Sequence, residues 1–254
     1  MLTAILSSKA GRVSDEITPE TSWRDIFKQS EDLLTAAVFT RLSYLPGDMF
    51  WRVLTETFGG PLGKYKIAKL DSIEFWPSWS RADGTRVEPD VFVSFLAGDP
   101  PRRVDLIIEA KLRRDDTKQS ETQWANQWLA YSETMSAERE LNDSNADELY
   151  LLAIGGLGPN RCAKLAELSK KAASEERAKD FQALGAGWDD LAKKLKQLVH
   201  GSASERRICR GALDALALAG YRPVHLLETL GPMGGAWNPD SAARAIEKYF
   251  GSEQ

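Results

Sequence analysis

Three apolar runs separated by turn residues form the clearest pattern in the first half of the chain. They cover residues 67 to 79, 87 to 95 and 103 to 112, and Gly and Pro lie in the stretches between them. Short runs rich in Val, Ile and Phe between Gly, Pro and Asp are typical of strands joined by hairpins. We therefore expect three consecutive antiparallel strands.

A helical pattern precedes these runs. Ser30 can cap a helix that begins at Glu31 and ends at Leu42. Leu34 and Val38 then fall with Leu42 on one face, which makes a continuous apolar stripe.

A second helical stretch covers residues 120 to 131, and an apolar run over residues 149 to 155 is typical of a buried strand. The predicted order is therefore helix, three antiparallel strands, helix and strand. This order indicates the α/β fold class, with a mixed central sheet flanked by helices.

The pattern divides the chain into three parts. Residues 1 to 21 carry turn-forming and polar positions, so we expect an irregular N-terminal segment. Residues 22 to 155 form the predicted α/β core. Residues 156 to 254 have mostly helical periods and no low-complexity linker, so we expect a helical C-terminal extension that packs on the core.

Two of the strands carry candidate chemistry. Residues i and i+2 of a strand share a face, so Glu109 and Lys111 should project side by side. If the two strands pair as a hairpin, Asp90 comes beside Glu109. Mg²⁺ prefers oxygen ligands, which Asp90, Glu109 and the Ala110 carbonyl could supply, and Mn²⁺ could substitute for it. The metal would activate a water, while Lys111 would position that water or stabilise the transition state.

This arrangement resembles the PD-(D/E)XK nuclease superfamily, with Pro89-Asp90 as the first half of its motif and Glu109-Ala110-Lys111 as the second. The resemblance implies a restriction-endonuclease-like αβββαβ core and metal-dependent hydrolysis of phosphodiester bonds. A plain alternative reads the same residues as solvated charges at strand ends.

Gln127 and Tyr131 are four residues apart and should share a helical face. They resemble the Q-x-x-x-Y element of the RecB-type branch, which implies that both lie beside the active site. Alternatively, Tyr131 belongs to an apolar helix face.

Glu31 is a further candidate, because a first-helix glutamate often completes the metal site in the superfamily. An acid in a first helical turn is also favoured by the helix dipole alone.

Composition and charge bear on the partners and the cellular compartment of the protein. The chain has 254 residues, 43% hydrophobic residues and a net charge of −4, so the charge does not indicate nucleic-acid binding by itself. Residues 161 to 210 are the exception, with 12 Lys and Arg against 7 Asp and Glu. Cys162 and Cys209 are too few for a disulfide framework or a zinc site, and neither a secretory signal nor a membrane span is evident. We expect a cytoplasmic protein.

The sequence thus favours a Mg²⁺-dependent nuclease acting on DNA, or on RNA, within a repair, restriction or anti-phage defence assembly. Two alternatives stay open: a catalytically inactive nuclease-fold subunit that binds nucleic acid or a protein partner, and a non-nuclease interaction protein. Protein partners and a homo-oligomer are compatible with each of these.

Overall fold

The computed structural model describes residues 12–15, 18–112, 118–139, 148–174, 180–198 and 201–221. These residues belong to one compact unit, Met1–Pro223. The elements are, in order, β1 (Arg12–Asp15), β2 (Thr18–Ser22), α2 (Trp23–Gln29), α3 (Glu31–Leu42), α4 (Gly47–Phe58), the 3-10 helix η1 (Gly60–Lys64), β3 (Ala68–Phe75), β4 (Trp79–Ser80), β5 (Arg86–Val87), β6 (Val91–Ala97), β7 (Arg102–Ala110), α5 (Glu121–Arg139), β8 (Glu148–Ile154), α6 (Arg161–Ala173), β9 (Ala183–Ala186), α7 (Trp188–Gln197) and α8 (Ala203–Leu218).

A five-stranded mixed sheet forms the centre, in the order β3-β6-β7-β8-β9. Strands β3, β6 and β7 are antiparallel neighbours, whereas β8 runs parallel to β7, and β9 parallel to β8. Residues 104 to 110 of β7 are all buried, as expected for a central strand covered on both faces. The expected α/β class with a mixed central sheet flanked by helices is confirmed. The predicted helix, three antiparallel strands, helix and strand correspond to α3, β3, β6, β7, α5 and β8, with α4, η1 and the short β4–β5 pair inserted among them.

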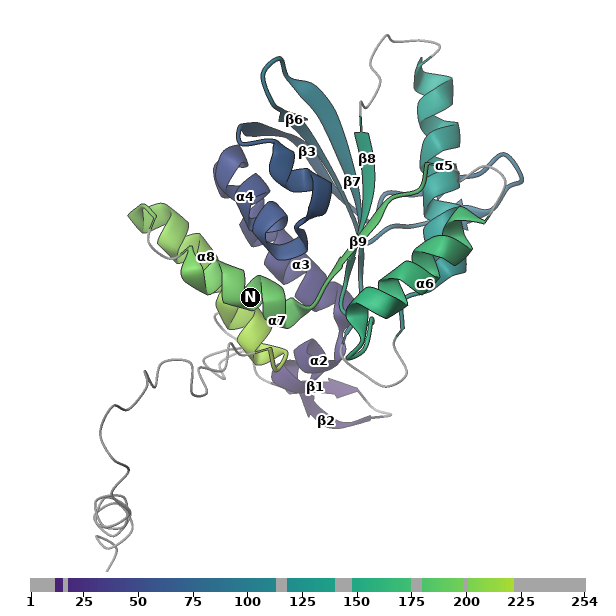
Figure 1. The fold of residues 1–254 in the computed structure, drawn as a ribbon. Coiled ribbons are helices and arrows are strands. Elements are labelled where there is room, and N and C mark those ends of the chain that lie inside the picture. Colours follow the sequence, from purple (N-terminus) through teal and green to yellow (C-terminus); the bar gives the residue numbers. More distant parts are fainter. Residues whose placement is uncertain are drawn as a thin grey trace, which may run out of the picture. The chain divides into compact units, whose positions relative to one another are not determined.

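Helices cover both faces of this sheet, with α3, α4, α7 and α8 on one side and α5 and α6 on the other (Figure 1). The period of two along β6 divides its side chains between the layers. Val91 and Val93 belong to the core beneath α3, α4, α7 and α8. Phe92 points to the opposite face and packs with Trp124 and Tyr131 of α5.

Two predicted boundaries need correction. Residues 12 to 15 and 18 to 22, expected to be irregular, pair as the antiparallel strands β1 and β2. The sheet also continues beyond residue 155, because β9 lies within the part expected to be helical. β9 has four residues and no apolar alternation, so its pairing depends on the exposed edge of β8. Residues 1–11 and 222–254 lie outside the described residues.

The expected packing of the C-terminal part on the core holds for α7 and α8. Leu191, Leu195 and Leu216 lie in the same apolar cluster as Leu34 and Val38 of α3. Within the described ranges, no helix combines the length and the apolar character needed to cross a membrane.

Candidate metal and active site

The candidate site lies where β6 begins and β7 ends. Val91 pairs with Ile108, so the next antiparallel pair is Asp90 and Glu109. The carboxylate of Asp90 accepts a hydrogen bond from the backbone N–H of Ala110 at 2.7 Å. The register of β6 with β7 therefore brings Asp90 opposite Glu109, and both side chains are buried.

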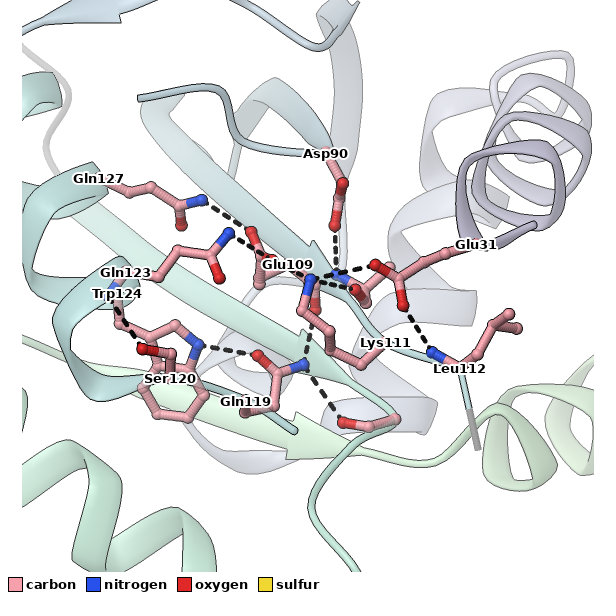
Figure 2. Close-up of polar contacts among 12 residues, drawn as sticks. Glu31, Asp90, Glu109, Lys111, Leu112, Gln119, Ser120, Gln123, Trp124 and Gln127 are labelled. Atoms are coloured by element: carbon pink, nitrogen blue, oxygen red, sulfur yellow. Dashed lines mark hydrogen bonds and ion pairs between the residues drawn. The ribbon is translucent and has the colours of Figure 1, made fainter. Parts of the chain in front are cut away.

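Lys111 follows β7 directly and joins the acidic groups (Figure 2). Its Nζ donates to Oε1 of Glu109 at 2.5 Å, to Oε1 of Glu31 at 3.1 Å and to the carbonyl oxygen of Ala110 at 2.9 Å. Its backbone N–H bonds the carbonyl of Ile154 at 2.8 Å, which holds it against β8. The ammonium group thus contacts three oxygens that the sequence assigned to a metal ion.

Glu31 reaches this place from the first turn of α3. The hydroxyl of Ser30 accepts from the N–H of Leu33 at 3.2 Å, as the predicted N-cap requires. The second carboxylate oxygen of Glu31 accepts from the backbone N–H of Leu112 at 2.8 Å. Glu31 therefore contacts the end of β7 as well as occupying the favourable N-terminal position of its helix.

Helix α5 supplies amide groups to Glu109. Nε2 of Gln123 donates to one carboxylate oxygen and Nε2 of Gln127 to the other, each at 2.7 Å. Glu109 thereby has a donor on both oxygens although it is fully buried. Oε1 of Gln127 is buried without a hydrogen-bond partner, so the site contains an acceptor that the described protein groups leave unused.

Tyr131 contacts a carboxylate that is not part of the candidate site. Its hydroxyl donates to Oδ2 of Asp105, which lies four residues before Glu109 on the same face of β7. At about 3.3 Å per strand residue, the two acids are separated by ~13 Å along the strand. Oδ1 of Asp105 also accepts from Ser94 at 2.6 Å and from Arg103 at 3.1 Å. Tyr131 therefore belongs to a separate buried polar cluster.

Gln119 is a site residue that the sequence analysis missed. Its Nε2 donates to the carbonyls of Glu109 and Gly155 at 3.1 and 3.2 Å, and its Oε1 accepts from the indole of Trp124 at 2.9 Å. Gln119 thus joins the ends of β7 and β8. The repeated spacing of four through Gln119, Gln123 and Gln127 was the available signal.

A glycine pair at the end of β8 makes room for Lys111. Gly155 and Gly156 have φ values of 75° and 66°. A Cβ on Gly155 would lie 2.0 Å from the carbonyl oxygen of Lys111, and one on Gly156 would lie 2.7 Å from its Cβ. Side chains here would therefore displace the lysine from the carboxylates.

Acidic groups outnumber basic groups in the site, and burial shifts their pKa values. Burial, and then the nearby Glu109, raise the pKa of Asp90 to about 7. Burial also raises the pKa of Glu109, against the opposing effects of Lys111 and Gln127. Burial opposes charging of Lys111, but Glu109 and then Asp90 and Glu31 raise its pKa above the ordinary value. One ammonium group therefore faces three carboxyl groups, and a further cation would stabilise them.

The donor set fits a hard divalent cation in its chemistry, since carboxylate and carbonyl oxygens are the ligands that Mg²⁺ prefers. Within the described part of the chain, however, no three His, Cys, Asp or Glu side chains converge as metal ligands do. The ammonium of Lys111 lies between Glu31 and Glu109. A metal ion bound by these oxygens would have to replace it.

Comparisons with known proteins add one relative. An uncharacterized protein of Pasteurella multocida is 30% identical over 178 residues, which cover 68% of this chain and 62% of that protein. The chain thus matches less than two thirds of this relative's length. No family model and no solved structure matches the chain.

Proposed function

We propose that the protein is a metal-dependent nuclease that hydrolyses phosphodiester bonds of DNA. The observation that carries the proposal is the position of the Lys111 ammonium, on oxygens of Glu31, Glu109 and Ala110. A positive charge already lies where the sequence motif assigns a cation. Asp90 adds a further buried carboxyl group at the same strand ends.

The arrangement of elements supports the same function. A helix, three antiparallel strands, a helix and a parallel strand occur in this order as α3, β3, β6, β7, α5 and β8, with α4, η1, β4 and β5 inserted before β6. This is the order that the resemblance to restriction-endonuclease-like cores implies. Fold similarity alone does not establish an activity, so the proposal depends on the site.

Each residue has a distinct role in the proposed reaction. Asp90, Glu109 and the Ala110 carbonyl would hold the divalent ion, with Glu31 as a further acid. When bound, the ion lowers the pKa of a water and neutralises phosphate charge. Lys111 would then turn its ammonium group toward that water or the pentavalent phosphate.

Side-chain amide groups of α5 hold the Glu109 carboxylate in position before substrate binds. Gln123 and Gln127 hold one oxygen each of Glu109, which limits rotation of the carboxylate. A carboxylate fixed in this way needs little reorganisation to accept a cation, which is a general advantage of preorganised sites.

A nuclease assay tests the proposal. Purified protein should cleave single-stranded or duplex DNA with Mg²⁺ or Mn²⁺ and should be inactive with EDTA. Asp90→Ala and Glu109→Ala should abolish cleavage while DNA binding persists, since a carboxylate removed near phosphate also removes repulsion. Glu167→Gln, on the exposed surface of α6, is the matched control and should leave the rate unchanged.

The outcomes separate the candidate functions. Cleavage that persists in both Asp90→Ala and Glu109→Ala would show that another site is responsible. Metal-dependent DNA binding without cleavage would instead favour the inactive nuclease-fold subunit. Absence of both divalent affinity and DNA binding would favour the non-nuclease interaction protein.

A further inference from the structure

A partly exposed tryptophan is bonded through its backbone to a residue of the candidate site. Trp76 directly follows β3 and keeps 37% of its surface exposed. Its backbone N–H donates to the carbonyl oxygen of Asp90 at 3.2 Å. Phe75 pairs with Val91, so this bond continues the register of β3 with β6 by one residue. The backbone of Trp76 therefore lies beside that of Asp90, a residue of the site.

The backbone of Trp76 is unusual for its residue type. Its φ is 51°, and every other positive φ among the described residues belongs to a glycine. A bulky residue in this region is a genuine conformational outlier that costs free energy. Pro77 follows, and a residue before proline strongly prefers an extended conformation. Such strain concentrates at functional sites, so the conformation of Trp76 calls for a functional explanation.

The ring is only partly covered by the protein. Phe75 lies against it with ring centroids 5.7 Å apart and planes inclined at 48°. A partly exposed indole on the residue that bonds the backbone of Asp90 suits a flat aromatic ligand. The flat groups of a nucleic acid are its bases, each of which has a π-face that can stack on tryptophan.

We propose that Trp76 stacks on an unpaired base of single-stranded DNA and so places the neighbouring phosphodiester at Asp90 and Glu109. This inference rests on the proposed nuclease function and specifies its substrate class. In a duplex, each base is covered by its neighbours and must leave the stack before a side chain can reach its face. The substrate therefore carries a single-stranded segment at the site.

Binding measured in EDTA tests this independently of cleavage. Fluorescence anisotropy compares a labelled single strand with its duplex, for wild-type protein, Trp76→Ala and Trp76→Phe. Trp76→Ala should weaken single-strand binding about 10-fold, within the range of one base–aromatic stack, and Trp76→Phe should retain most of the affinity. Duplex binding should not change. The control variant is Tyr44→Ala, because Tyr44 is an aromatic residue outside the site that is 68% exposed. It should bind like wild type.

Intrinsic fluorescence provides a second readout that does not depend on the folding of Trp76→Ala. Single-stranded DNA should quench the emission of wild type more than that of Trp76→Phe, because a stacked base quenches this indole directly. Equal quenching in the two proteins, or equal single-strand affinity in Trp76→Ala and wild type, overturns the proposal. An equal loss of affinity for single strand and duplex also overturns it, since stacking on an unpaired base would then not be the cause.

The two proposals fail in different ways. If Asp90→Ala abolishes cleavage but Trp76 variants bind single strands normally, only the stacking role is wrong. If the protein cleaves nothing and Trp76→Ala still loses single-strand affinity, the stacking role stands and the nuclease function is wrong.

Discussion

At the scale of single residues, Lys111 decides the character of the site. Its ammonium group holds Glu31 and Glu109 together, and 16% of its side chain is exposed. A buried ion pair has a large desolvation cost, so removing one partner leaves the other charge uncompensated. The same lysine is thus an internal counterion in this structure, and in the proposed reaction it would become a catalytic group.

Replacing Lys111 by Met should strengthen divalent-ion binding and abolish cleavage. The ammonium would no longer compete for the oxygens of Glu31 and Glu109, so the dissociation constant for Mn²⁺ should fall about 10-fold, equivalent to ~1.4 kcal/mol. Isothermal titration calorimetry measures this without DNA. Lys171→Met, at an exposed pair on α6, is the control. Unchanged or weaker Mn²⁺ binding in Lys111→Met would show that the lysine does not occupy a metal position.

Tyr131→Phe should reduce stability and leave the metal site intact. The change removes the hydroxyl that donates to buried Asp105, and a buried acceptor that loses its donor costs about 1–3 kcal/mol. Urea denaturation measures the loss, and Mn²⁺ titration should give the wild-type affinity. A marked loss of Mn²⁺ affinity would place Tyr131 in the metal site after all.

At the scale of elements, α5 positions the site through two kinds of contact. Gln123 and Gln127 donate hydrogen bonds to Glu109, while Trp124 and Trp128 are buried. Both indoles lie against Phe181, with ring centroids 6.3 and 4.9 Å away. The polar face of α5 therefore holds the Glu109 carboxylate in position, and its aromatic face packs the helix against Phe181.

Trp128→Ala should test the packing face alone. A large-to-small change at a buried aromatic costs about 3–5 kcal/mol, so the midpoint of urea unfolding should fall substantially. Cleavage at low temperature, where the variant remains folded, should change little because Trp128 does not contact Glu109. A variant as stable as wild type would mean that α5 does not depend on this contact.

At the scale of the whole molecule, the proposed metal binding at the buried acids would be linked to the stability of the fold. A ligand that binds only the folded state stabilises it by about 2.7 kcal/mol at 100 times its dissociation constant. Mn²⁺ should therefore raise the melting temperature of the wild-type protein relative to EDTA. Glu109→Gln should lose this increase and Glu167→Gln should keep it, as thermal unfolding in parallel would show. An increase that persists in Glu109→Gln would place the ion elsewhere.

The sequence alone determined the local elements and the main acid pair. Apolar runs rich in Val, Ile and Phe and the turns between them predicted the strands, and the N-cap at Ser30 predicted the start of α3. Hairpin pairing then followed from short connections, which brought Asp90 beside Glu109 without knowledge of any other contact. These features depend on residues close in the chain, and local physics is sufficient for them.

Only the tertiary structure decided the rest. β9 has too little alternation to be recognised and exists because β8 offers an edge. Tyr131 shares a helical face with Gln127, but each helical turn moves a side chain about 5.4 Å along the axis. Its partner therefore depends on how α5 crosses β7, and that crossing brought it to Asp105. The contacts of Lys111 with Glu31 join residues 80 positions apart, which only packing of α3 against the sheet can establish.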